Sequence, residues 1–214
     1  MAAPVGYGPR QDLDVRGALM DTAEQLFGTH GLDAVSLRAV GREAGVSPRG
    51  VIYHFPTKSD LLKAVIRRRG DQVGTQIRDA LSGLLGAKGD VTTRAVVDAI
   101  LNPFAGLVRE EPQAGLHWLK IYYELARRDD PIWEAMLEQT PDVRGLFHDA
   151  TIRALPDYDD ADVRERLGIA MFSMLGSLAG ADLVNGGSRI TRQGFDTRFL
   201  EQLARFTAAG MAAR

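Results

Sequence analysis

A short stretch near the amino end carries side chains suited to recognition by hydrogen bonding. Arg49 follows Ser47 closely, and Tyr53 and His54 come one helical turn later. A guanidinium group presents a planar fork of donors that pairs with two acceptors at once, as on the major-groove edge of guanine. Arg49 is therefore a candidate for a contact to a base, if the segment that carries it enters the major groove.

Two short helices must position these side chains. Ser36 can cap a first helix, and Gly45 stops that helix and permits the turn after it. Ser47 can cap a second helix, whose first position is Pro48 and which closes at Phe55. Two helices joined across such a turn form a helix-turn-helix unit, in which the second enters the major groove and the first crosses the DNA backbone.

Apolar periods of 3.6 residues extend on both sides of this unit. They predict a helix at about 13–29 before it and, after a capping-box pattern at Thr57 and Asp60, a helix to about Leu85 that bridges two domains. Gly70 and Gly74 favour a kink or hinge in that helix. Further helices are expected at about 91–109, 114–128, 131–154, 160–184 and 192–212, with breaks at prolines and at Asn185-Gly186-Gly187. No strand period is found.

Composition and charge exclude several classes of protein. The chain has 214 residues and no cysteine, which excludes disulfides, zinc-thiolate sites and thiol nucleophiles. The net charge is −2, but residues 1–70 hold ten Lys and Arg against seven Asp and Glu, so the basic part coincides with the helix-turn-helix unit. There is no signal-peptide core and no apolar run of bilayer length, so we expect a cytoplasmic protein without a membrane partner.

Catalytic and metal-binding patterns are also missing from the sequence. There is no nucleophile elbow and no phosphate-binding glycine loop, and the four histidines show no metal-ligand spacing. We therefore expect no enzymatic activity, no metal and no cofactor.

Residues 36–62 read SLRAVGREAGVSPRGVIYHFPTKSDLL. This stretch resembles the DNA-binding signature of the TetR family of transcriptional regulators, and the likeness extends over residues 15 to about 68. Gly41 departs from the alanine usual in that family, and Pro48 departs from a polar or basic residue. The resemblance implies an all-helical dimer that regulates transcription.

The resulting fold class is all-α, with about nine helices. We assign a flexible arm to residues 1–10, a three-helix helix-turn-helix domain to 11–68, and a helical-bundle domain for ligand binding and dimerisation to 69–214.

DNA contacts are assigned from the motif and from the resemblance. The start of the second motif helix should meet base edges, whereas the resemblance implies phosphate contacts for Ser36, Tyr53 and Lys58. Arg38 has two interpretations, a phosphate contact or a solvated outer face. Ile52 and Phe55 are expected on the apolar side of the helix, and Arg67, Arg68 and Arg69 are taken as a solvated run without a role. The complete DNA-binding set is Ser36, Arg38, Ser47, Pro48, Arg49, Gly50, Tyr53, His54 and Lys58.

Aromatic and thioether side chains concentrate in the second domain. They are usually core, but pockets in helical bundles are lined in the same way. The candidate pocket residues are Phe104, His117, Trp118, Tyr122, Trp133, Met136, Met171, Ser173 and Met174. The last two helices are rich in apolar residues and suggest half of an intersubunit four-helix bundle. The candidate dimer residues are Leu167, Met171, Leu175, Leu178, Phe195, Phe199, Leu203 and Phe206.

The sequence thus predicts a homodimeric repressor that an apolar or aromatic small molecule releases from a palindromic operator, with the bridging helix transmitting the change. Two alternatives stay open. One is a DNA-binding factor of the same fold that no small ligand controls. The other is a helical carrier or enzyme that has lost DNA binding.

Overall fold

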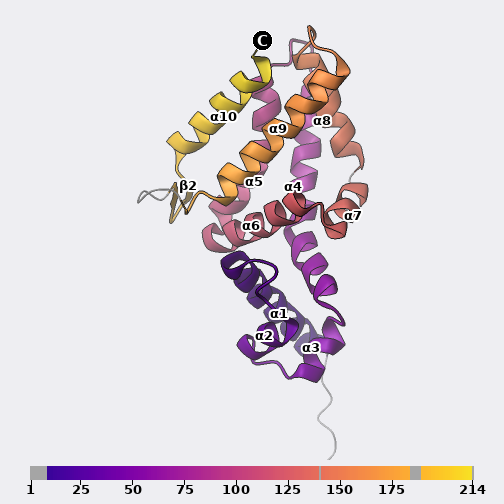
Figure 1. Ribbon diagram of the computed structural model, residues 1–214, viewed down its shortest axis with the longest axis vertical. Coiled ribbons are helices and arrows are strands. Elements are labelled where there is room, and N and C mark those ends of the chain that lie inside the picture. The colour runs from indigo at the N-terminus through magenta and orange to yellow at the C-terminus, as the bar shows by residue number, and fades with distance from the viewer. Residues whose placement is uncertain (1–8, 140, 184–188, 214) are drawn as a thin grey trace, which may run out of the picture.

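A computed structural model of the chain describes residues 9–139, 141–183 and 189–213 (Figure 1). The predicted arm, apart from its last two residues, and the predicted break at 185–187 lie outside these ranges. The helices are α1 Pro9–His30, α2 Leu37–Glu43, α3 Pro48–His54, α4 Lys58–Gly86, α5 Thr93–Glu110, α6 Pro112–Arg128, α7 Pro131–Gln139, α8 Pro141–Ala154, α9 Asp160–Ala179 and α10 Thr197–Ala212. Two short strands, β1 Ile190–Thr191 and β2 Gly194–Phe195, pair antiparallel.

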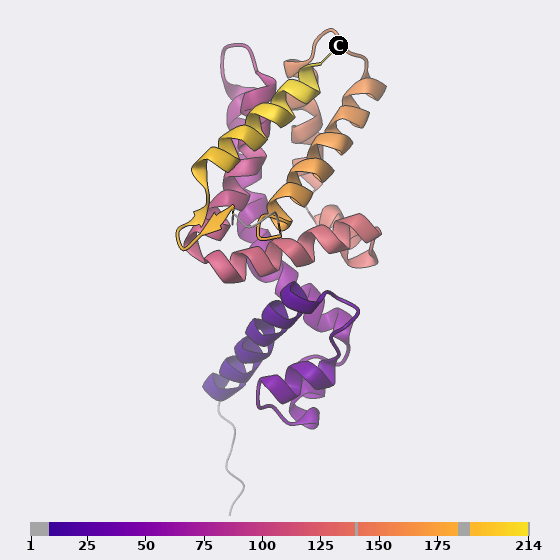
Figure 2. The ribbon, with the colours of Figure 1, turned by 60° about the vertical axis from the view of Figure 1, so that its left-hand side comes forward.

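The helices form two units joined by α4. The small unit of α1, α2, α3 and the start of α4 lies at one end of the molecule, and α4 runs out of it into the larger unit (Figures 1 and 2). There α6 crosses at the junction of the two units, beneath α5, α8, α9 and α10. We call the first unit the helix-turn-helix domain and the second the bundle domain. The assigned boundary at 68/69 falls inside α4, which is a continuous helix.

Local capping explains why the small helices begin where they do. The Ser36 hydroxyl accepts from the amide of Ala39 at 3.2 Å, and the Ser47 hydroxyl accepts from the amide of Gly50 at 3.2 Å. Thr57 and Asp60 form the predicted capping box at the start of α4. Because each of these contacts spans three residues, the sequence alone was enough to place them.

An apolar core extends through both domains. Leu19 and Phe27 from α1 are buried, as are Val73, Ile77 and Leu81 along α4. These residues belong to one contiguous cluster that continues to α10. No described helix has both the length and the apolar character needed to cross a bilayer.

The all-α prediction is confirmed, with corrections in the second half of the chain. The described residues form ten helices rather than about nine, because Pro141 starts a new helix where 131–154 was expected to be one. A proline lacks the amide hydrogen and collides with the preceding turn, so it begins α8 instead of continuing α7. Pro9 likewise starts α1 within the predicted arm.

The region before the last helix was also predicted wrongly. The helix expected at 160–184 ends at Ala179, and the helix expected at 192–212 starts only at Thr197. The hairpin between them contradicts the expectation of no strands; its strands have two residues each, too few for a period of two to be visible. Gly194 holds φ at 103°, which a side chain would strain.

Candidate nucleic-acid interface

The outward side of α3 presents the residues expected to read DNA. Val51 and Phe55 anchor the helix, with exposures of 3% and 2%. Pro48 and Arg49 are exposed on the surface, and Tyr53 is 73% exposed. The side chains suited to hydrogen bonding are therefore free of the core and lie on the surface of one short helix.

Ile52 was expected on the apolar side of α3, and this was wrong. Its side chain is 60% exposed, because Val51 occupies the inward position and Phe55 follows it by one turn. Ile52 sits between that inward stripe and the exposed ring of Tyr53. The helix thus adds an apolar group to the surface that carries Arg49.

Several other predicted contacts lie beside α3. Ser36 and Arg38 are exposed at the start of α2, and each capping serine hydroxyl keeps its hydrogen available for donation. The half-buried ring of His54 meets the ring of Tyr53 edge-on, with centroids 5.0 Å apart. This edge contact limits the orientations open to both rings.

Lys58 differs from the other predicted phosphate contacts. Its Nζ donates a hydrogen bond to the carbonyl oxygen of Leu32 and lies 5.6 Å from the centre of the Phe27 ring. The side chain therefore binds the turn between α1 and α2 in this structure. A phosphate contact by Lys58 remains a prediction, and it requires exchange of this partner.

The departure at Gly41 has a packing explanation. A Cβ atom at Gly41 would lie 2.5 Å from Cγ2 of Val51, inside van der Waals contact. The buried valine fills the place that an alanine methyl would take, so the pair brings α2 and α3 close together.

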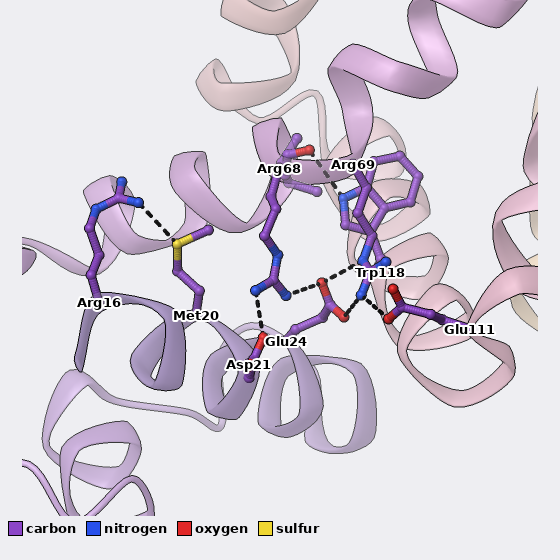
Figure 3. Close-up of polar contacts among 9 residues, drawn as sticks. Arg16, Met20, Asp21, Glu24, Arg68, Arg69, Glu111 and Trp118 are labelled. Carbon is purple, nitrogen blue, oxygen red and sulfur yellow. Dashed lines mark hydrogen bonds and ion pairs between the residues drawn. The ribbon is translucent and has the colours of Figure 1, made fainter. Parts of the chain in front are cut away.

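A cluster of charged residues around one buried carboxylate joins α1 to α4. Glu24 of α1 is 2% exposed, and its carboxylate accepts from Arg68 at 3.0 Å and from Arg69 at 3.1 Å (Figure 3). Arg68 also binds Asp21 at 2.5 Å, and Arg69 binds Glu111 at 2.7 Å. We call these five residues the buried clamp. The view of Arg68 and Arg69 as a solvated run was wrong, since both guanidinium groups are held by carboxylates.

Glu111 extends the buried clamp into the bundle domain. It ends α5 and precedes α6, so Arg69 connects this corner to Glu24 of the helix-turn-helix domain. The hydrogen bond from Arg69 lowers the pKa of Glu111. One arginine therefore links carboxylates from both domains.

A second polar contact joins α6 to the turn between α1 and α2. The amide of Leu32 donates to Glu124 Oε2 at 3.2 Å, and Arg128 donates to both oxygens of Asp33 at 2.9 and 2.7 Å. Arg128 also pairs with Glu124 at 2.6 Å. We call these four residues the turn clamp. The hydrogen bond from Arg128 lowers the pKa of Asp33, although the Asp33 side chain is 80% exposed.

Helices α1 and α6 touch directly between the two clamps. A Cβ atom at Gly28 would lie 2.4 Å from Cβ and 2.6 Å from Cα of His117, so α1 and α6 approach to backbone distance there. Burial lowers the pKa of His117. The junction therefore consists of one close helix crossing with a polar clamp on each side.

The predicted pocket residues are divided between core and surface. Phe104, Trp118 and Met174 are buried to 2% exposure or less, whereas Ser173 lies on the surface. The ring of Tyr122 stacks on Trp118 at 5.0 Å and meets Phe104 at 5.5 Å and Trp133 at 4.9 Å. These four rings fill one another's space. The remaining candidates Met136 and Met171 are partly buried against the core.

His117 is separated from these rings and faces an open groove. The groove has a volume of about 1040 Å³ and lies between α1, the start of α6 and the hairpin. Its lining includes Gln25, Glu111, His117, Asp182 and Arg192. A groove at the domain junction was not expected from the sequence.

Most of the predicted dimer residues point into their own chain. Leu167, Leu175, Leu178, Phe195 and Leu203 are each at most 9% exposed, so they belong to the core of the single chain. Met171 and Phe199 are partly buried, and Phe206 is 76% exposed. The exposed apolar side chains of α9 are instead Ile169 and Phe172, at 71% and 47%. A helix that is apolar nearly all round does not reveal which side faces inward.

Comparison with known proteins gives matches over both domains. The family model described as bacterial regulatory proteins, tetR family, matches residues 19–65, and a tetracyclin repressor-like C-terminal domain matches residues 98–210. The HTH-type transcriptional regulator BetI of Rhizobium meliloti is 30% identical over 147 residues, which are 69% of this chain and 68% of that protein. The HTH-type transcriptional regulatory protein RaaS of Mycobacterium tuberculosis is 30% identical over 159 residues, covering 72% and 65%.

A solved structure resembles the whole chain. A TetR family transcription regulator from Marinobacter aquaeolei VT8 superposes with a TM-score of 0.63 at 17% identity, and the match covers 97% of this chain and 100% of that one. At this identity the likeness concerns the fold.

Proposed function

The chain belongs to the TetR family of bacterial regulatory proteins and is a DNA-binding transcriptional regulator, and from this premise we propose that it is a homodimeric repressor whose two copies of α3 read a palindromic operator. We further propose that a small molecule bound in the bundle domain releases it. The observation that carries the DNA-reading proposal is the outward side of α3, where Arg49 and Tyr53 are exposed while Val51 and Phe55 anchor the helix.

Each exposed group on α3 suits one feature of DNA. Arg49 supplies a bidentate contact to guanine, and Pro48 and Ile52 supply apolar contacts to thymine methyl groups. Tyr53, Ser36 and Arg38 supply phosphate contacts that set the register of the helix in the groove. A bacterial regulator that binds chromosomal DNA acts in the cytoplasm, so we assign it there.

The dimer proposal rests on apolar side chains left exposed on α9 and α10. Ile169, Phe172 and Phe206 lie on the surface of these two neighbouring helices, and a second copy would bury them in a four-helix contact. A twofold dimer would place two recognition helices about 34 Å apart, one turn of B-DNA.

The effector proposal rests on the ring cluster and its hydroxyl group. Burial raises the pKa of Tyr122, whose ring lies against those of Phe104, Trp118 and Trp133. An apolar or aromatic molecule that separated Tyr122 from Trp133 would gain both the ring faces and this polar group. The close packing of the four rings favours a second candidate function, in which the protein binds DNA without control by a small ligand.

Footprinting on the DNA upstream of the protein's own gene tests the operator proposal. We expect a palindromic protected region, and we expect Arg49→Ala to weaken binding by about 1–3 kcal/mol and to relax the sequence preference at one position in each half-site. Arg127→Ala, which removes an exposed charge from α6, is the matched control and should leave the footprint intact. Absence of a salt-dependent footprint in the wild type would contradict the proposal.

Thermal unfolding against a library of small aromatic compounds tests the effector proposal. A compound that binds only the folded protein raises the unfolding midpoint. We expect such a compound to weaken operator binding, and Tyr122→Phe to reduce its effect. A midpoint that no compound moves would support the ligand-independent candidate.

A further inference from the structure

We infer that Glu124 and Arg128 of the bundle domain are positioning residues for operator binding: they hold the turn between α1 and α2 and thereby set the direction in which α2 and α3 face DNA. This inference rests on the proposed reading of a palindrome by two copies of α3. The turn clamp thereby controls how the recognition helices are oriented on DNA, without touching DNA itself.

Leu32 holds the turn from two sides, through its amide and through its carbonyl oxygen. The amide of Leu32 donates to Glu124 of α6, and its carbonyl oxygen accepts from Lys58 at the start of α4. Asp33 is held by both outer nitrogens of the Arg128 guanidinium. A bidentate guanidinium–carboxylate pair fixes a relative orientation as well as a distance.

The distance along the chain from this turn to the DNA-reading unit is short. Ser36, which caps α2, follows Asp33 by three residues, and α2 packs against α3 through Gly41 and Val51. A rotation of the turn is therefore passed to the start of α2 and, through that close contact, to α3. Only Ala34 and the buried Val35 stand between Asp33 and the cap of α2.

Helix α6 also carries the ring cluster on another of its faces. Trp118 and Tyr122 lie one turn apart and contact Phe104, whereas Glu124 and Arg128 lie one turn apart and contact the α1–α2 turn. The Trp118 indole nitrogen donates to the carbonyl oxygen of Ile66 in α4 at 3.1 Å. A shift of α6 that begins at the rings thus reaches the turn directly, in addition to any path through α4, which the sequence had suggested as the transmitting helix.

The exposure of the turn clamp indicates that it orients the turn more than it stabilises the fold. Asp33 is 80% exposed and Arg128 33% exposed, and exposed ion pairs contribute little to folding. Holding a turn in one place nevertheless removes freedom that would otherwise be lost on DNA binding. In a dimer, the two turns also fix the separation of the recognition helices.

The test measures operator geometry in the full-length protein. The palindrome recovered by selection from random DNA is compared with versions that have one base pair inserted or deleted between the half-sites. Arg128→Ala and Glu124→Ala should bind the selected palindrome about threefold to tenfold more weakly. They should also lose most of the wild-type preference for the selected spacing.

Conservative and neighbouring variants separate positioning from general damage. Glu124→Gln keeps the oxygen that accepts from Leu32 and should retain the spacing preference. Arg127→Ala removes a charge one residue away from Arg128 and should behave as wild type. The double variant of Asp33→Ala and Arg128→Ala should lose no more than Arg128→Ala alone, because Asp33 acts through Arg128, whereas Asp33→Ala should lose less, because it leaves the pair of Arg128 with Glu124. Asp33 is exposed, so this cycle stays informative even if Glu124→Ala fails to fold.

The possible outcomes are distinguishable. If the wild type selects no palindrome, the proposed function fails. If the wild type prefers one spacing and Arg128→Ala and Asp33→Ala keep both that preference and the affinity, the inference about the turn clamp is overturned. Hydrogen exchange at the Leu32 amide provides a further check, because Glu124→Ala should speed it and Glu124→Gln should not.

Discussion

The buried clamp and the turn clamp join the same two domains with similar chemistry in opposite surroundings. Glu24 in the buried clamp is 2% exposed and binds two guanidinium groups, whereas Asp33 in the turn clamp is 80% exposed and binds one. A buried charge that loses its partner is costly, but an exposed charge is rehydrated. Distances near 3 Å therefore do not by themselves say what an ion pair contributes to stability.

Removal of the buried carboxylate should have the largest effect on stability. Glu24→Ala leaves Arg69, whose side chain is 13% exposed, without its main partner, so we expect a loss of about 3 kcal/mol in the free energy of unfolding. Asp21→Asn removes the exposed partner of Arg68 and should cost at most about 0.5 kcal/mol. Urea unfolding curves of both variants give the difference. Equal losses would contradict the distinction between a buried and an exposed ion pair.

The helix crossing between the clamps should show the next largest effect. Gly28→Ala places a methyl group 2.4 Å from His117 Cβ, and relief requires α1 and α6 to separate; we expect a loss of about 1–3 kcal/mol. Gly17 lies on the same helix with nothing within 4 Å of its Cβ position, so Gly17→Ala should stabilise by up to about 1 kcal/mol. A stable Gly28→Ala variant that keeps wild-type operator affinity would show that the crossing can open without consequence.

Acid should weaken the same crossing through His117. Burial, followed by the charge of Lys120, lowers the pKa of His117 from its ordinary 6.5. Below 6.5 the unfolded chain therefore binds more protons than the folded one, and stability falls as pH drops from there through the folded pKa. We expect His117→Asn to flatten this part of a stability–pH profile measured by urea unfolding. A His117→Asn profile as steep as that of the wild type would contradict this assignment.

The smallest effect on stability is expected at the turn clamp. Asp33→Asn should leave the thermal midpoint at neutral pH close to that of the wild type, because the carboxylate is exposed. The Arg128 hydrogen bond lowers the pKa of Asp33 from 3.8, so the contribution of its charge is present above that value and is lost only as pH falls through the folded pKa. A large drop in the midpoint at neutral pH would place the turn clamp with the buried clamp.

The helix-turn-helix domain was predictable from sequence because its determinants are local. Ser36 and Ser47 cap helices through contacts three residues away, and Gly45 takes φ of 67° in the turn between them. The clamps were not predictable in this way. Glu24 and Arg69 are 45 residues apart, and Leu32 and Glu124 are 92 apart. Each charged residue alone resembles an ordinary solvated side chain.

Side-chain direction limited the predictions for the bundle domain. The sequence assigned Leu175 and Leu178 to a dimer interface, because this helix is apolar nearly all round. Both side chains are buried within the single chain, and the exposed apolar residues of α9 are Ile169 and Phe172. Similarly, the richness in aromatic residues made Trp118 and Tyr122 candidates for a pocket, whereas their rings stack on each other. Both questions depend on how helices distant in sequence pack together.

The junction also sets conditions for building hybrid regulators. The helix-turn-helix domain presents Asp21, Glu24, Gly28 and Asp33 to the rest of the molecule, and none of the four lies on the outward surface of α3. A designer who grafts a different operator specificity onto this bundle domain therefore needs to transplant only the α2–α3 surface and to keep these four positions. A graft that brings its own α1 would also replace the residues at these positions of α1, and not the operator specificity alone.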